Sequence, residues 1–419
     1  GSTKRNQKDF DLYLMDGIDP KSTRLLKQTE GYWAAADWSA DDSLVLLMNY
    51  IAADDSRLHI INPKTKAISQ INASDKKISY GSFAFARDRN GVYYTSDEDS
   101  EFIRLTYYDL STGKKEILTP DLKWDVSELA VSKDGKWIAY STNEGGVSKV
   151  YLAPTSSLNA PQLVPLPKGV ASGLKFDSLD RRLGFSLNTS QSPTDVYSID
   201  LSTGKLDKWT SSEVGGLNRS RFVTPELIEY PTFDEVDGKP RKIPSFYFKP
   251  AGASKQAIPV VIDFHGGPEG QTDASFSYLV QYWVNELGVA VLQPNVRGST
   301  GYGKSYQKLD NESKREDSVK DIGKLLDWIA LQPELDSSRI AVFGGSYGGY
   351  MVLSSMFHYN DRLRCGIDVV GISNFVTFLT NTEDYRRDLR RVEYGDERDP
   401  AMRKFLESIS PTTNAGKIR

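Results

Sequence analysis

Short β-rich stretches recur at a fixed distance through the first half of the chain. Four segments occupy the same place in successive units, with spacings of 47, 46 and 45 residues: Trp38–Asp41, Phe85–Asp88, Val131–Asp134 and Phe176–Leu179. Each unit continues with two further β-rich runs, which are 44–48 and 58–61, 91–95 and 105–108, 137–141 and 150–152, and 183–187 and 196–199. A period of about 45 residues with several short strands per unit is typical of propeller blades. The period is too long for a β-solenoid and too short for tandem sandwiches, so we predict a β-propeller.

The repeat also predicts how many blades this sequence holds. It runs over residues 8–215 and gives four blades, and residues 11–16 match the later strand of a unit with nothing before it. The predicted propeller is therefore partial, with about four to five blades. Because a propeller closes on itself to hide its sheet edges, we expect further blades N-terminal to this sequence. We assign residues 1–220 to the propeller.

The apolar pattern changes in the second half, where buried strands alternate with helical segments. Apolar runs at Ile258–Phe264, Val289–Pro294 and Arg339–Phe343 predict buried strands. A helix is expected from Asp321, because four apolar residues form one face at helical spacing: Ile322, Leu325, Leu326 and Ile329. This alternation is typical of a doubly wound parallel sheet, which we expect to begin with a hairpin at 239–250. We predict an α/β domain over residues 221–419.

A glycine-rich turn joins the third of these strands to an apolar helical segment. Gly344-x-Ser346-x-Gly348 between a strand and a helix is the nucleophile-elbow pattern of α/β-hydrolases. A Cβ at either glycine would collide with neighbouring backbone, and the strained serine would project at a helix N-terminus. The alternatives are a structural turn without chemistry and a phosphate-binding loop, although the latter lacks the Lys-Ser/Thr ending of a P-loop. We predict Ser346 as the catalytic nucleophile.

A His-Gly-Gly-Pro loop directly follows the first buried strand. His265-Gly266-Gly267-Pro268 occupies the place where this fold positions an oxyanion donor. The glycines let the backbone approach a substrate carbonyl with its N–H groups exposed. We predict an oxyanion hole formed by the backbone of Gly267 and Tyr347, and we interpret the His265 ring as structural, tied into its own loop.

Composition narrows the function classes further. Lys and Arg total 52 against 56 Asp and Glu, with a net charge of −4 and no basic block, which argues against nucleic acid as a partner. No apolar run approaches a membrane span, and three scattered histidines predict no metal site; no cofactor is expected. The single cysteine, Cys365, is expected to be buried in a strand over residues 365–370. It leaves the compartment open between cytoplasm and periplasm.

Three motifs in order give the chain a family resemblance. His265–Pro268, Arg297–Gly303 and Gly344–Tyr350 resemble the prolyl oligopeptidase family of serine peptidases, closest to its acylaminoacyl-peptidase and dipeptidyl-peptidase branches. The resemblance covers roughly residues 225–419. It implies a propeller of seven or eight blades before the hydrolase, more than the four to five that the repeat gives in this sequence, and it implies short peptide substrates.

The same fold requires an Asp and a His after the nucleophile, and the sequence offers no suitable histidine. Only His358 follows Ser346, and a helix would carry it about 18 Å along its axis, whereas a general base needs contact at about 3 Å. His59 lies in the repeat and His265 in the oxyanion loop. We therefore expect the Asp and His on a missing C-terminal segment, so that the hydrolase domain is incomplete at its C-terminus. An inactive family member is the alternative.

The resemblance also implies a substrate pocket. It would place five apolar or aromatic side chains around the residue before the cleaved bond: Tyr347, Tyr350, Ile372, Phe375 and Phe378. The alternative is that these are core aromatics under a helix. The arginine-rich segment 385–391 is interpreted as an ion-paired helix face. Three functions stay open: a serine peptidase for short peptides, an esterase of small acyl esters, and an inert propeller-based binding protein. A homo-oligomer is also left open.

Overall fold

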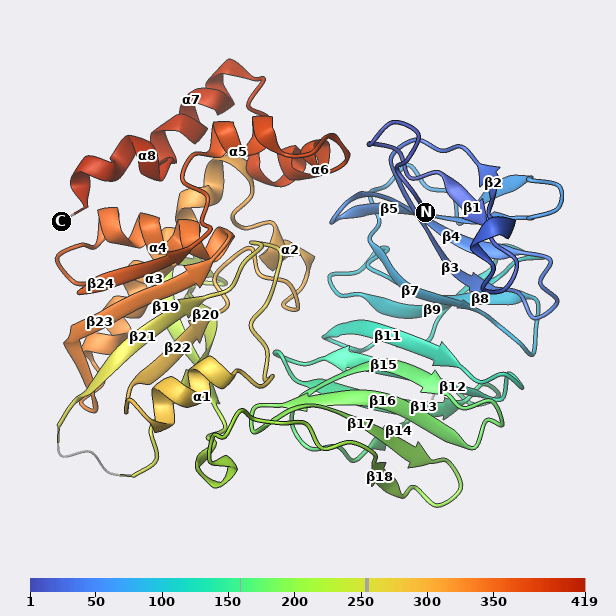
Figure 1. Ribbon diagram of the computed structural model, residues 1–419, viewed down its shortest axis with the longest axis horizontal. Coiled ribbons are helices and arrows are strands. Elements are labelled where there is room, and N and C mark those ends of the chain that lie inside the picture. Colours follow the sequence, from blue (N-terminus) through green and yellow to red (C-terminus); the bar gives the residue numbers. More distant parts are fainter. Residues whose placement is uncertain (159, 253–255, 419) are drawn as a thin grey trace.

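Two bodies lie side by side in the computed structural model, which describes residues 1–158, 160–252 and 256–418 (Figure 1). Small antiparallel sheets built from the N-terminal half form one body, and a larger mixed sheet with its helices forms the other. Each repeat unit of the sequence forms one four-stranded sheet. The first two sheets contain β3 (Tyr32–Trp38), β4 (Val45–Ala52), β5 (Asp55–Ile61) and β6 (Ile68–Ile71), then β7 (Tyr80–Phe85), β8 (Gly91–Ser96), β9 (Arg104–Asp109) and β10 (Lys115–Ile117). The next two contain β11 (Asp125–Val131), β12 (Trp137–Asn143), β13 (Ser148–Pro154) and β14 (Gln162–Val164), then β15 (Val170–Phe176), β16 (Arg182–Thr189), β17 (Ser192–Asp200) and β18 (Leu206–Lys208).

The repeated sequence segments form the turn between the first two strands of each sheet. Ser39 Oγ donates to Asp41 Oδ1 at 2.6 Å and accepts the N–H of Leu44 at 2.9 Å. Ser132 and Asp134 repeat the same contacts in the third unit, at 2.8 Å and with the N–H of Trp137 at 2.9 Å. Short polar side chains that bond their own backbone stabilise tight turns, which explains why these residues recur.

Aliphatic and tyrosine side chains fill the spaces between neighbouring sheets. Leu46 and Leu58 of one sheet pack with Val92 and Tyr94 of the next, and all four are fully buried. A hairpin of β1 (Leu12–Leu14) and β2 (Arg24–Lys27) packs on the first sheet. Within the described residues, this first body consists of four four-stranded sheets and this hairpin, in agreement with the repeat. The number of blades in a whole propeller stays a prediction.

The α/β body has a six-stranded sheet in the order β19-β20-β22-β21-β23-β24. Its strands are β19 (Glu226–Val236), β20 (Lys239–Phe248), β21 (Ile258–Phe264), β22 (Ala290–Pro294), β23 (Leu335–Gly345) and β24 (Cys365–Val369). The last four strands of the order pair in parallel, as predicted, whereas the β19–β20 hairpin joins β22 antiparallel. Asp237 and Gly238 form the hairpin turn with φ of 53° and 71°, the signs that match the twist of a two-residue hairpin.

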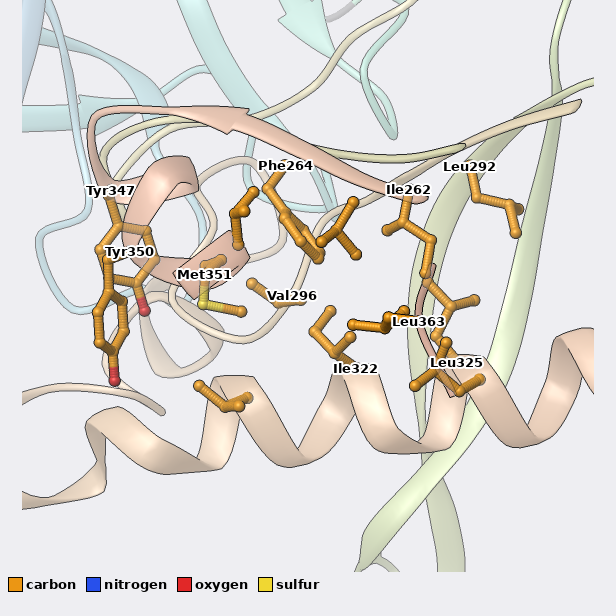
Figure 2. Packing of buried hydrophobic residues seen from close by; sticks show 14 of the residues in the cluster. Ile262, Phe264, Leu292, Val296, Ile322, Leu325, Tyr347, Tyr350, Met351 and Leu363 are labelled. Carbon is orange, nitrogen blue, oxygen red and sulfur yellow. The ribbon is translucent and has the colours of Figure 1, made fainter. Parts of the chain in front are cut away.

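Helices cover both faces of this sheet. They are α1 (Tyr278–Asn285), α2 (Lys304–Gln307), α3 (Arg315–Ala330), α4 (Tyr347–His358), α5 (Phe375–Asn381), α6 (Asp384–Tyr394), α7 (Pro400–Ile409) and α8 (Pro411–Asn414), with short 3₁₀ turns at Pro20–Ser22, Arg219–Arg221, Glu312–Lys314 and Ala415–Lys417. Ile322 and Leu325 of α3 pack toward Ile262 and Leu292 of the sheet (Figure 2). Helix α1 packs against the opposite face. No described helix is long and apolar enough to cross a membrane.

Two predictions about these elements need correction. Helix α3 begins at Arg315 rather than Asp321, because its first turns bury the polar groups of Arg315 and Ser318, which apolar periodicity does not reveal. Cys365 was expected to be buried, but it is exposed. It lies on β24, the last strand in the sheet order. Every residue of that strand is exposed in the part of the chain that the structure describes.

Candidate active site

Ser346 lies between β23 and α4 in a backbone conformation that few side chains adopt. Its φ is 56° and its ψ is −121°, outside the helical and strand regions, which costs about 1–3 kcal/mol. The Ser346 N–H donates to Val369 O of β24 at 3.0 Å. The side chain itself is exposed. The surrounding fold therefore holds a strained serine with its hydroxyl presented to solvent.

The two glycines of the elbow are required by close backbone contacts, as predicted. A Cβ at Gly344 would lie 2.5 Å from Gly348 O, and a Cβ at Gly348 would lie 2.3 Å from Phe264 O. Real Cβ atoms do not approach backbone this closely, so no side chain fits at either position. The glycines bring the start of α4 against the end of β21, and this contact carries the next loop to the serine.

The His-Gly-Gly loop lies beside Ser346. A Cβ built on Gly266 would be 3.5 Å from Ser346 Cβ and 4.0 Å from Ser346 Oγ. Gly267 has a φ of 136°, which favours glycine. Tyr347 is the first residue of α4, where backbone N–H groups have no partner within the helix. The structure thus places Gly266 and Tyr347 next to Ser346; the role of the predicted oxyanion donors, Gly267 and Tyr347, stays a prediction.

None of the three histidines is placed to act as a base on Ser346. His265 lies within its own loop, with Nδ1 2.8 Å from Gly266 O and Nε2 2.9 Å from Ser299 Oγ, and burial lowers its pKa. That confirms the structural interpretation of His265. His358 at the end of α4 contacts Glu316 Oε2 at 2.9 Å, and His59 packs on Trp33 in the first sheet. Within the described ranges, no cluster of three or more His, Cys, Asp or Glu side chains is arranged to hold a metal ion.

A pocket of about 490 Å³ opens beside the nucleophile. Its lining includes Ser346, Val370, Ile372 and Phe378, so two of the five predicted pocket residues line it. The other three lie beneath it, in the core: Tyr347, Tyr350 and Phe375 are 1%, 0% and 0% exposed. For these three, the contacts are those of core aromatics, with Tyr350 and Phe375 ring centres 4.7 Å apart.

Sequence reasoning missed the polar wall of this pocket. It is lined by Asn374, Thr377, Asn381, Thr382, Glu383, Tyr385 and Arg386. Most arginines of α6 form ion pairs as expected, for example Arg387 with Asp384 at 2.9 Å and Arg391 with Asp388 at 2.8 Å. Arg386 instead faces the pocket. No local signal distinguishes it from its neighbours, because its place depends on how α6 docks.

Comparisons with known proteins point to one family. Residues 274–418 match the model of the prolyl oligopeptidase family. Dipeptidyl aminopeptidase BIII of Pseudoxanthomonas mexicana is 26% identical over 343 residues, which cover 79% of this chain and 49% of that protein. Dipeptidyl peptidase family member 6 of Caenorhabditis elegans is 24% identical over 375 residues, covering 83% and 50%. Residues 274–418 therefore resemble the prolyl oligopeptidase family, and most of the chain is similar to proteins named as dipeptidyl peptidases.

Solved structures agree with the fold of this chain. A Mycobacterium tuberculosis puromycin-hydrolyzing peptidase superposes with a TM-score of 0.83 at 19% identity, covering 96% of this chain and 62% of that one. The match includes both bodies, so the resemblance seen in three motifs extends to the arrangement of sheets. The chain spans about half the length of the curated relatives it matches.

A buried charged cluster lies beneath the elbow that carries Ser346. Asp310, Arg315 and Glu393 are 0%, 0% and 2% exposed, and Arg315 pairs with Asp310. Burial raises the pKa of Asp310 to about 6 and that of Glu393 to about 8, against the opposing effect of Arg315. Burial also raises the pKa of nearby Glu269. Sequence reasoning missed this cluster, since its members are far apart along the chain.

The raised pKa of Glu393 predicts a specific dependence of stability on pH. Between its ordinary value of 4.5 and about 8, the folded protein holds a proton that the unfolded chain releases. The free energy of unfolding should therefore fall as pH rises through this window. Glu393→Gln should reduce that fall by about 1–3 kcal/mol.

Urea unfolding of the full-length protein and the Glu393→Gln variant at about pH 5, 7 and 9 measures this difference. Glu407→Gln is the matched control, because Glu407 is an exposed carboxylate on α7 paired with Arg403 at 3.1 Å. Parallel pH curves for the wild type and Glu393→Gln would contradict the prediction.

Proposed function

We propose that this protein is a serine peptidase that cleaves short peptides through an acyl-enzyme on Ser346. The observation that carries the proposal is the strained, exposed Ser346 with the His-Gly-Gly loop directly against it. A structural turn without chemistry would not need a strained serine at this point. The relatives support a peptide substrate, since one is named a dipeptidyl aminopeptidase and another a puromycin-hydrolyzing peptidase.

The proposed reaction follows from the geometry at Ser346. Its Oγ adds to the substrate carbonyl carbon, the hydroxyl proton passes to a base, and the N–H groups of Gly267 and Tyr347 bind the developing oxyanion. Collapse of this intermediate breaks the C–N bond, and the amine leaves with the proton. Water then hydrolyses the ester on Ser346 by the same steps.

We also propose that the Asp and His come from a segment outside residues 1–419. The open edge of β24 supports this, because β24 stands last in the described sheet beside β23, and Ile367 and Val370 are 51% and 86% exposed. Strands added at this edge would bring their loops to the end of the sheet where Ser346 projects. Exposed apolar edge strands are otherwise sites of aggregation.

The substrate preference follows from the pocket walls. Because Val370, Ile372 and Phe378 line the pocket beside Ser346, peptides with an apolar residue or proline before the cleaved bond should be preferred. We expect a kcat/KM at least about 10-fold higher for these than for peptides with Asp or Lys there. Phe378→Ala should reduce that preference.

A panel of peptides matched except at this residue, with the corresponding acyl esters, tests the proposal on the full-length protein. A preference for Asp or Lys would refute the pocket assignment. Turnover of the esters without turnover of any peptide would favour the esterase, and turnover of neither would favour an inert binding protein.

A further inference from the structure

The buried guanidinium of Arg315 lies between two tyrosine rings below the nucleophile. Arg315 is the first residue of α3, and its side chain is fully buried. Its guanidinium carbon is 5.3 Å from the centre of the Tyr347 ring and 4.8 Å from that of Tyr394. Cation–π contacts are strongest where the cation is removed from water, as it is here. The cation thus contacts one residue of the elbow and one from the end of α6.

The first ring fixes one side of the predicted oxyanion hole. Tyr347 follows Ser346, and its backbone N–H is one of the two predicted donors. Its hydroxyl lies 2.9 Å from Ser318 Oγ and donates to Asp310 Oδ2 at 3.3 Å. Asp310 is itself paired with Arg315. Arg315 therefore contacts the ring of Tyr347, and its ion-pair partner Asp310 binds the hydroxyl.

The second ring fixes the other side. The Tyr394 hydroxyl donates to Gly267 O at 2.8 Å, which holds the residue whose N–H is the second predicted donor. Arg315 Nη2 donates to the neighbouring Glu393 O at 3.0 Å, and so anchors the end of α6 that carries Tyr394. The Tyr347 and Tyr394 rings also contact each other, with centres 6.3 Å apart.

We propose that Arg315 is a positioning residue that sets the two halves of the oxyanion hole against each other, acting through Tyr347 and Tyr394. The inference rests on the proposed function, because it assigns a second layer to that same site. Gly267 belongs to the loop after β21 and Tyr347 to α4, so a common support must fix their separation. Donors that are preorganised at the oxyanion position stabilise the transition state, and small displacements weaken them.

A purely structural role makes a different prediction. A buried ion pair often contributes little net stability, so Arg315 need not be present for folding energy alone. If it only filled the core, its loss would lower stability without a selective effect on the chemical step. If it positions the donors, kcat should fall about 10- to 100-fold while KM changes less than about 3-fold, because the lost interaction acts in the transition state.

The test uses full-length variants that remove single links. Tyr394→Phe removes the hydrogen bond to Gly267 O, Tyr347→Phe removes the link to Asp310, and Arg315→Lys keeps the charge but loses the planar group. Tyr359→Phe is the matched control: Tyr359 directly follows α4, and its hydroxyl donates to Val319 O of α3 at 3.1 Å, away from the loop of Gly267. Thermal unfolding of each variant identifies any that fails to fold.

Two readouts separate this inference from the proposed function. Amide hydrogen exchange over residues 264–270 and 344–350 should accelerate in Tyr394→Phe and Arg315→Lys, but not in Tyr359→Phe, whether or not the protein cleaves peptides. The kcat loss should then accompany it. Unchanged exchange in folded variants would overturn the positioning role, and faster exchange with unchanged kcat would overturn its link to catalysis. A wild type that cleaves nothing refutes the proposed function, and the exchange data still decide the positioning.

Discussion

Ser346→Ala in the full-length protein is expected to abolish labelling by a fluorophosphonate probe and to lower peptide hydrolysis by about 10⁶-fold. The reason is chemical: alanine has no nucleophilic side chain to form the acyl-enzyme, and Ser346 is the residue held exposed at the end of β23. Labelling is measured by intact mass and by mapping the modified peptide. Thermal unfolding should show that the variant still folds.

Two controls sharpen this result. Ser373→Ala changes another serine lining the same pocket and should leave labelling intact. Residues 1–419 produced alone should label far more slowly than the full-length protein if the base lies outside them, because the serine alcohol is then not activated. Persistent labelling of Ser346→Ala would remove the nucleophile assignment, and rapid labelling of residues 1–419 would remove the external base.

Gly348→Ala is expected to destabilise the protein by about 3–5 kcal/mol and to abolish activity. The added methyl would lie 2.3 Å from Phe264 O and 2.9 Å from His265 O, both backbone atoms of the strand and loop beside the nucleophile. Relief of this contact requires α4 to move away from β21, which would separate the two predicted oxyanion donors. Urea unfolding and peptide turnover measure the two effects.

Gly345→Ala is the matched control in the same turn. Its added methyl would lie 3.5 Å from Val369 O, an ordinary contact, and the residue does not have a positive φ. It should lose less than about 1 kcal/mol. Equal losses in the two variants would show that the turn needs glycine for flexibility rather than for the contact with β21.

Local patterns in the sequence determined the propeller repeat, the parallel strands and the elbow. The repeat can be recognised because turn residues recur at its period: in the first and third sheets Ser39 and Ser132 accept a backbone N–H of their own turn. The elbow can be recognised because Gly344 and Gly348 each lie so close to other backbone atoms that no side chain fits. The repeat and the Gly-x-Ser-x-Gly motif each occupy a short stretch of the chain, so both can be recognised from the sequence alone.

Contacts between distant segments decided the rest. From the sequence we predict Tyr347, Tyr350 and Phe375 as pocket residues. The packing of α4 and α5 instead buries these three side chains and leaves Ile372 and Phe378 beside Ser346. No pattern in the sequence marks Arg315, yet folding encloses its guanidinium between the rings of Tyr347 and Tyr394. Burial and charge pairing depend on which elements meet in space, and apolar spacing along one element carries no information about that partner.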